Sequence, residues 1–207
     1  MFYREAGDFS TSYPEDSQTF PIRFDRYRYY LVLFVAIFVI PFTINDYWVN
    51  SIFLPFLIYA IAAIGLNILV GYCGQVSLGT GGFMAVGAYA CYKLMTAFPE
   101  VSMLIHVLIA GLITAGVGVM FGLPSLRIKG FYLAVATLAA QFFLVWLFNR
   151  VPWFYNYSAS GQISAPERTV FGIEVTGPNT EAWASYLFCL AFVIFSAVIA
   201  RNLTRGA

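Results

Sequence analysis

Charged side chains are scarce in this sequence. Only 10% of the residues are Asp, Glu, Lys or Arg, whereas 60% are apolar and the mean hydropathy is +0.77. Soluble domains carry about 25% charged residues, so the composition excludes a soluble globular protein and indicates an integral membrane protein. The net charge of +1 gives no electrostatic reason to expect a nucleic-acid partner.

The common catalytic and metal-binding motifs are also missing. The sequence contains no HExxH, GxSxG, CxxC or phosphate-binding GxxxxGK[ST] pattern, so we expect neither an enzymatic activity nor a metal or cofactor. No Asp or Glu falls inside an apolar run, which argues against a proton-coupled carrier. The cysteines Cys73, Cys91 and Cys189 are an odd number without metal-ligand spacing, and we interpret them as small packing residues.

Long uncharged runs predict an all-α membrane protein with six transmembrane helices. A bilayer core needs about 20 apolar residues per helix, so one run is long enough for two helices and each of the others provides one. The double run turns back between Gly71 and Gly79. The uncharged runs are Tyr29 to Asn45, Tyr47 to Tyr92 (the double one), Val101 to Leu126, Gly130 to Asn149 and Ala182 to Ala200.

Basic residues predict the orientation of these helices. Arg23, Arg26 and Arg28 precede the first helix and Asp46 follows it, which places the N-terminus in the cytoplasm by the positive-inside rule. Four segments are then expected in the cytoplasm: residues 1–28 as a polar tail, 71–79 as a turn, 124–130 between the fourth and fifth helices and 201–207 after the sixth helix. We assign residues 29–200 to a transmembrane domain, in which 149–181 form a loop on the outer side of the membrane.

The glycine-rich stretch from Gly65 to Phe83 stands out inside the double run. Its glycines and polar side chains expose hydrogen-bonding groups that hydrocarbon cannot satisfy, so the stretch is expected to face protein or water and to line a pathway. An ordinary cytoplasmic turn with glycines for close packing remains the alternative. The polar side chains of the stretch are Asn67, Gln75, Ser77 and Thr80.

Two later helices carry further candidates. Ala110, Thr114, Gly118 and Gly122 recur every four residues and predict a small-residue ridge for helix packing. Gln141 near the centre of the fifth helix is a candidate pathway residue, because buried polar groups are costly in membranes. A helix-to-helix hydrogen bond without a transport role is the other interpretation of Gln141.

Two remaining features receive structural interpretations. His106 is interpreted as a hydrogen-bonded interface residue, without a role in transport. The long loop contains Thr169 to Thr176, whose β-favouring residues around a glycine predict a short hairpin that could contact a soluble partner outside.

Two blocks of the sequence resemble a known family. Asn67-Ile-Leu-Val-Gly-Tyr-Cys-Gly-Gln-Val-Ser-Leu-Gly79, followed by Phe83 and Gly87-Ala-Tyr89, resembles the signature of the branched-chain amino acid ABC transporter permeases. Leu126-Arg-Ile-Lys-Gly-Phe-Tyr-Leu-Ala-Val-Ala-Thr-Leu-Ala139 is similar to a second block of the same family, especially of its M-type subunit. Urea-type permeases share this pattern.

The resemblance implies a subunit of an importer in the bacterial inner membrane, moving leucine, isoleucine and valine. The implied partners are a second permease subunit, two cytoplasmic ATPase subunits and a periplasmic substrate-binding protein, besides membrane lipid. Six residues fall on the family motif and are expected to line or gate the translocation path: Asn67, Gly71, Gly74, Gln75, Ser77 and Gly79.

The sequence departs from the family pattern in two places. Relatives often carry a histidine where this chain has Thr80, so no imidazole role is transferred to that position. Family members also continue into a basic ATPase-docking segment and further helices, so the chain resembles only the N-terminal two-thirds of a permease. A truncated membrane scaffold that does not transport is therefore a second hypothesis.

Overall fold

The computed structural model describes residues 23–43, 45–126, 131–160, 163–170, 172–177 and 180–205. The chain divides into two compact units, Met1–Ile44 and Asn45–Ala207, which are described separately. The described part of the first unit is one helical run made of α2 (Arg23–Phe34), η1 (Val35–Val39) and α3 (Ile40–Thr43). This run begins at Arg23 rather than at the expected Tyr29. The tail before Arg23 and the motif residues 127–130 lie outside the described residues.

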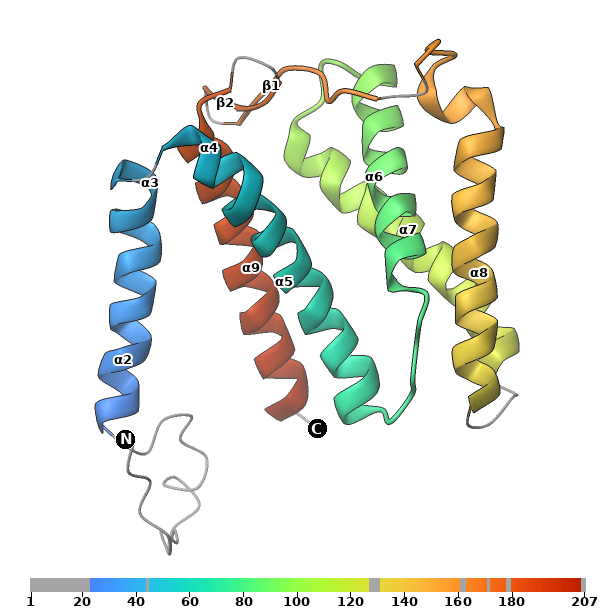
Figure 1. Ribbon diagram of the computed structural model, residues 1–207, viewed down its shortest axis with the longest axis horizontal. Helices are drawn as coiled ribbons and strands as arrows, with labels where there is room; N and C mark the ends of the chain where they lie inside the picture. The colour runs from blue at the N-terminus through green and yellow to red at the C-terminus, as the bar shows by residue number, and fades with distance from the viewer. Residues whose placement is uncertain are drawn as a thin grey trace, which may run out of the picture. The chain divides into compact units, whose positions relative to one another are not determined.

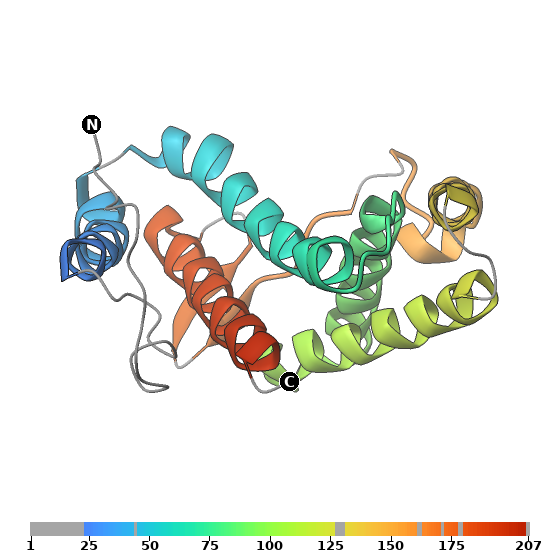
Figure 2. The same cartoon turned by 90° about the horizontal axis from the view of Figure 1, so that it is seen from below.

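The described residues of the second unit form five helical runs and one hairpin. Figures 1 and 2 show its helices side by side, with the hairpin across one end. The elements are α4 (Asp46–Trp48), η2 (Val49–Phe53), α5 (Leu54–Asn67), η3 (Ile68–Tyr72), α6 (Thr80–Ala97), α7 (Met103–Leu126), α8 (Phe131–Arg150), η4 (Pro152–Tyr155), β1 (Arg168–Val170), β2 (Ile173–Thr176) and α9 (Ala182–Arg205).

Widened π-helical turns accompany the prolines inside two of the helical runs. A proline has no N–H and its ring clashes with the carbonyl four residues earlier. For Pro41 and Pro55 that carbonyl belongs to Ile37 and Ser51, which lie inside η1 and η2 respectively. The wider turn separates the carbonyl from the ring, and the helix continues through the proline instead of ending.

The helix α6 occupies the centre of one half of the second unit, where it packs against α7 and α8, whereas α5 packs mainly against α9. Buried Val86, Leu144 and Phe148 form the core between α6 and α8. The rings of Tyr89 and Phe148 stack with centroids 4.4 Å apart. On the other side, the ring of Phe53 meets Tyr186, which is 2% exposed, edge to face.

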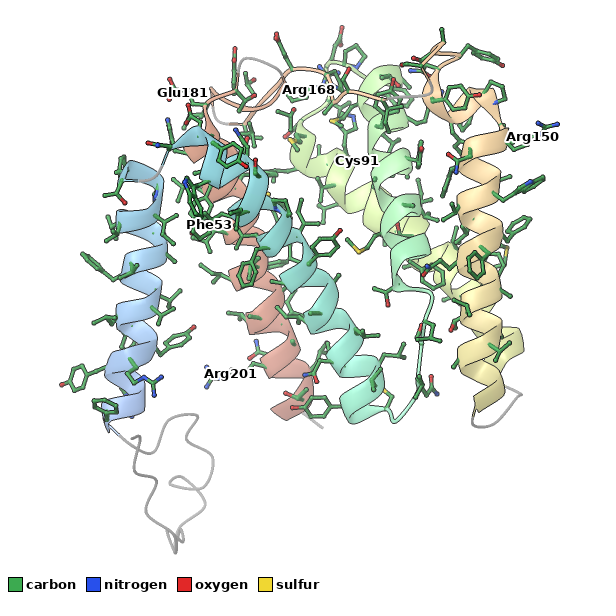
Figure 3. The ribbon with its side chains drawn as sticks, in the orientation of Figure 1. Phe53, Cys91, Arg150, Arg168, Glu181 and Arg201 are labelled. Atoms are coloured by element: carbon green, nitrogen blue, oxygen red, sulfur yellow. The ribbon has the colours of Figure 1, made fainter. Side chains whose placement is uncertain are left out.

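The predicted hairpin is present. Strands β1 and β2 pair antiparallel, and the Ser185 hydroxyl of α9 donates to the Val175 carbonyl at 2.9 Å. Arg168 of β1 lies at the C-terminal end of α6, where its guanidinium donates to the carbonyls of Met95 and Pro99 (Figure 3). The bond to Met95 satisfies a carbonyl that the helix end leaves without a partner, and the cation also complements the helix dipole there.

Four described helical runs are long and apolar enough to cross a membrane: Arg26–Thr43, Asp46–Tyr72, Met103–Leu123 and Ala182–Thr204. The apolar stretch Ala134–Arg150 of α8 is shorter, and α6 carries Lys93 and several glycines among its 18 residues. Together the six helical runs agree with the six crossings expected from the sequence. The chain is a multi-pass helical membrane protein.

Candidate functional site

The glycine-rich motif forms an extended connection inside the second unit. After η3 ends at Tyr72, the chain from Cys73 to Gly79 has no regular structure, and α6 begins only at Thr80. In Figure 1 this segment runs back beside the helices, so that α6 starts well away from the end of α5. We call residues 73–79 the linker segment.

The linker segment is fixed to α8 through one threonine. The Leu78 N–H donates to the Thr137 hydroxyl oxygen at 3.0 Å, and that hydroxyl donates to the Ala134 carbonyl at 3.0 Å. A Cβ atom on Gly79, which is buried, would lie 2.8 Å from the Thr137 carbonyl oxygen. Only a glycine therefore allows this close approach of the two backbones.

Thr137 is the seventh residue of α8, so the contact lies about 9 Å along the helix from its start. Extended backbone at such a depth needs protein or water for its hydrogen bonds, because lipid supplies none. The Thr137 hydroxyl provides one of these bonds. The linker segment therefore runs along the side of α8 rather than beyond its end.

Gln141 lies one helical turn beyond Thr137, against the first turn of α6. A Cβ atom on Gly82 would meet the Gln141 Cα at 3.0 Å, and one on Gly81 would lie 3.4 Å from the Gln141 Oε1. Within the described residues, no hydrogen bond to the Gln141 amide is found. The side chain is only half-buried, and it belongs to the α6–α8 interface.

The residues at the N-terminal end of the motif are mostly exposed. Asn67, Gly71 and Gly74 are exposed and Gln75 is half-buried. The Asn67 side chain folds over Gly71, so that a Cβ there would lie 2.9 Å from the Asn67 Oδ1. Gly74, the second residue of the linker segment, adopts a φ of 65°. This left-handed conformation turns the chain away from the helical path.

Ser77 and Thr80 line a cavity of about 550 Å³ between α5, α6 and α7. Most of its wall is apolar, as in known ligand sites, which have a few polar groups in apolar surroundings. The Ser77 hydroxyl accepts from the Gly79 N–H at 3.4 Å, and the Thr114 hydroxyl donates to the Ala110 carbonyl at 2.8 Å. The cavity thus combines apolar surface with neutral hydroxyl groups.

The small-residue ridge of α7 divides into two halves. Ala110 is buried, and the Thr114 hydroxyl lies 3.2 Å from a Cβ built on Gly87 of α6. A Cβ on Gly118 or Gly122 would meet no described atom within 4 Å. The first half of the ridge therefore makes the close contact with α6.

The seven predicted pathway residues lie in three different environments in the structure. Ser77 faces the cavity, Gly79 and Gln141 contact the α6–α8 interface, and the other four lie at the mostly exposed N-terminal end of the motif. Thr137 was missed by sequence reasoning. Its position four residues before Gln141, on the same helical face, was the available signal.

Two other sequence interpretations also need revision. Cys73 is exposed in the linker segment, so it is not a packing residue, whereas Cys91 and Cys189 are half-buried. His106 is 1% exposed as expected for an interface residue, but neither of its ring nitrogens has a hydrogen-bond partner among the described residues.

Comparison with known proteins identifies relatives of the chain. The family described as "branched-chain amino acid transport system / permease component" matches residues 49–206. The high-affinity branched-chain amino acid transport system permease protein LivM of Salmonella typhimurium is 32% identical over 169 residues, and that of Escherichia coli is 31% identical. Each match covers 72% of this chain and 39% of the relative. No solved structure matches significantly.

The matched region includes the linker segment, the cavity around Ser77 and the α6–α8 interface. It also contains all seven predicted pathway residues. The family consists of membrane permeases, and the six long helical runs of this chain agree with a membrane protein. The chain therefore belongs to the family of branched-chain amino acid transport permease components.

Proposed function

We propose that the chain is a transmembrane permease subunit of an ATP-binding-cassette importer for branched-chain amino acids. It would act in the bacterial inner membrane with its N-terminus in the cytoplasm, beside a second permease subunit. ATP hydrolysis would take place on two cytoplasmic ATPase subunits, and a periplasmic binding protein would deliver the substrate. Family membership and the names of the relatives support this proposal.

One structural observation carries the proposal: the linker segment runs beside α8, with Gly79 buried against Thr137, and borders the cavity that Ser77 lines. Apolar walls suit a leucine, isoleucine or valine side chain. Neutral hydroxyls hydrogen-bond a zwitterion without holding it by charge, and conduction requires binding that is weak enough for release. The contact between Gly79 and Thr137 fixes the segment that borders this cavity.

Substitution of Gly79 tests the role of the segment. Gly79→Ala places a Cβ 2.8 Å from the Thr137 carbonyl, so the linker segment must shift. We expect ATP-dependent leucine uptake to fall about tenfold or more, because overpacking of this kind costs about 1–3 kcal/mol. Uptake is measured in membranes that hold the partner subunits, with the amount of assembled complex measured in parallel.

Gly116→Ala is the matched control, since Gly116 of α7 does not line the cavity and a Cβ there meets no described atom within 4 Å. Its uptake should stay close to that of the unmodified chain. Normal uptake by an assembled Gly79→Ala variant would refute the role of the segment. Uptake that an excess of urea blocks and valine does not would instead favour a urea permease. No uptake by the unmodified chain with all its partners would favour the non-transporting scaffold.

A further inference from the structure

A second cavity lies at the opposite end of α6 from the linker segment. It has a volume of about 700 Å³ and lies between α6, α7, α8 and η4. Val86, Val117, Leu144 and Phe148 form part of its apolar wall. Trp153, which is 52% exposed, also lines it, so the cavity reaches the surface of the molecule.

One cation lines this cavity. The Lys93 ammonium lies 4.2 Å from the centroid of the Trp153 ring and donates to the Asn156 Oδ1. The Asn156 amide nitrogen donates to the Tyr92 hydroxyl at 2.9 Å, which fixes the orientation of the amide. Lys93 is therefore held in place by a ring and a neutral oxygen, and no carboxylate is among the residues that line the cavity.

These polar groups favour an anion over a zwitterion. A free amino acid has an ammonium group that needs an acceptor or a carboxylate, whereas the charged group of the cavity is a donor. The Thr96 hydroxyl is already bonded to the Lys93 carbonyl. A molecule with one negative charge and a long apolar part matches both the cation and the apolar wall.

The length of the cavity indicates how long the apolar part of its ligand is. The lining residues of α6 run from Val86 to Ala97, about 16 Å at 1.5 Å per residue. Half of a bilayer's hydrocarbon core measures about 15 Å. The cavity thus has the length of an acyl chain in one leaflet. Trp153, which lines the cavity, and Tyr92, which accepts a hydrogen bond from Asn156, are of the kind found at the level of the lipid headgroups.

We propose that this cavity binds an anionic phospholipid, with one acyl chain against Val86, Leu144 and Phe148 and the phosphate on Lys93. Basic pockets between membrane helices bind anionic headgroups in this way. The long lysine side chain extends from the apolar part of α6 toward the interface. Bound lipid would fill a space that is otherwise empty between three helices.

Native mass spectrometry of the chain, purified from its membranes in mild detergent together with its accompanying subunits, tests the proposal. Dioleoyl phosphatidylglycerol is the anionic probe and dioleoyl phosphatidylethanolamine the zwitterionic one. We expect phosphatidylglycerol to be retained preferentially. Lys93→Met should weaken its binding about fivefold or more, since one basic residue contributes about that factor near a lipid surface.

Arg150→Met is the control, because Arg150 is an exposed cation at the end of α8 that does not line the cavity (Figure 3). It should leave the retention of phosphatidylglycerol unchanged. Equal retention of the two lipids, or equal loss in the two variants, would overturn the proposal.

A second pair of variants tests the acyl-chain site without altering charge. Ala90→Phe fills the cavity and should release the lipid, whereas Ala88→Phe adds the same ring at an exposed position of α6 and should not. A photoreactive benzoylphenylalanine in place of Ile113, another lining residue, identifies the occupant directly. An adduct with phospholipid supports the proposal, and an adduct with a polypeptide would overturn it.

Discussion

At the scale of single residues, Thr137 fixes the linker segment. Thr137→Val removes the hydroxyl that accepts from the Leu78 N–H, while the volume of the side chain is nearly unchanged. We expect the free energy of unfolding to fall by about 1–3 kcal/mol, because a backbone donor loses its partner. Thermal unfolding in detergent measures the loss. Thr137→Ser keeps the hydroxyl and should lie near the unmodified chain, and equal losses in both variants would contradict the argument.

Gly74 offers a test of backbone conformation alone. Its φ is 65°, and no described atom lies within 4 Å of a Cβ built there, so a side chain would meet strain but no clash. Gly74→Ala should lower the melting temperature, since the left-handed conformation costs about 1–2 kcal/mol for an L-residue. Gly74→Asn should lower it less, because asparagine tolerates this conformation. The opposite order of the two variants would contradict the prediction.

Residue types alone indicated which part of the chain is unusual, but not what each residue does there. Glycines and hydroxyls in an apolar run predicted that residues 65–83 face protein or water. Which residues they contact depends on how far along α8 the linker segment lies. That position depends on the packing of helices that are distant in the sequence, so it cannot be derived from residue types. Thr137 and the separate environments of Ser77 and Gln141 therefore became visible only in the structure.

At the scale of elements, Arg168 links the hairpin to the end of α6. Arg168→Met removes the bonds to the Met95 and Pro99 carbonyls. Amide hydrogen exchange over residues 168–176 should become about tenfold faster or more, since a hydrogen bond to a charged group contributes about 1.5–3 kcal/mol. Arg150→Met is the comparison and should leave this exchange unchanged. Unaltered exchange in Arg168→Met would show that the Ser185 contact alone holds the hairpin.

Elements were largely predictable because their signals are local. The start of α6 at Thr80 follows the turn expected at residues 71–79, and the β-favouring residues around Gly172 predicted the hairpin. The widened turns η1 and η2 were not foreseen. A proline inside a helix usually kinks or ends it, whereas these helices accommodate Pro41 and Pro55 by one wider turn each.

At the scale of the whole molecule, the proposed orientation places Cys73 on the cytoplasmic side and the loop before the hairpin outside. In a Cys91→Ser, Cys189→Ser background, an impermeant maleimide should label exposed Cys73 only when the inner face is accessible. A cysteine introduced at exposed Ser164 should be labelled in intact cells. This pattern follows from the bias of basic residues toward the cytoplasm. The reverse labelling pattern would contradict the proposed orientation.

The widened turns have a consequence for how the gene can change. Each π-helical turn contains one residue more than the α-helix needs, so the loss of one residue from Val49–Phe53 would return the turn to α geometry. Residues on both sides would keep their faces toward α9. The same loss within Leu54–Asn67 would rotate everything beyond it by about 100°. Among related genes that still encode a working protein, deletions of a single codon should therefore be found in the π-helical turns. They should be absent from the neighbouring α-helical stretches.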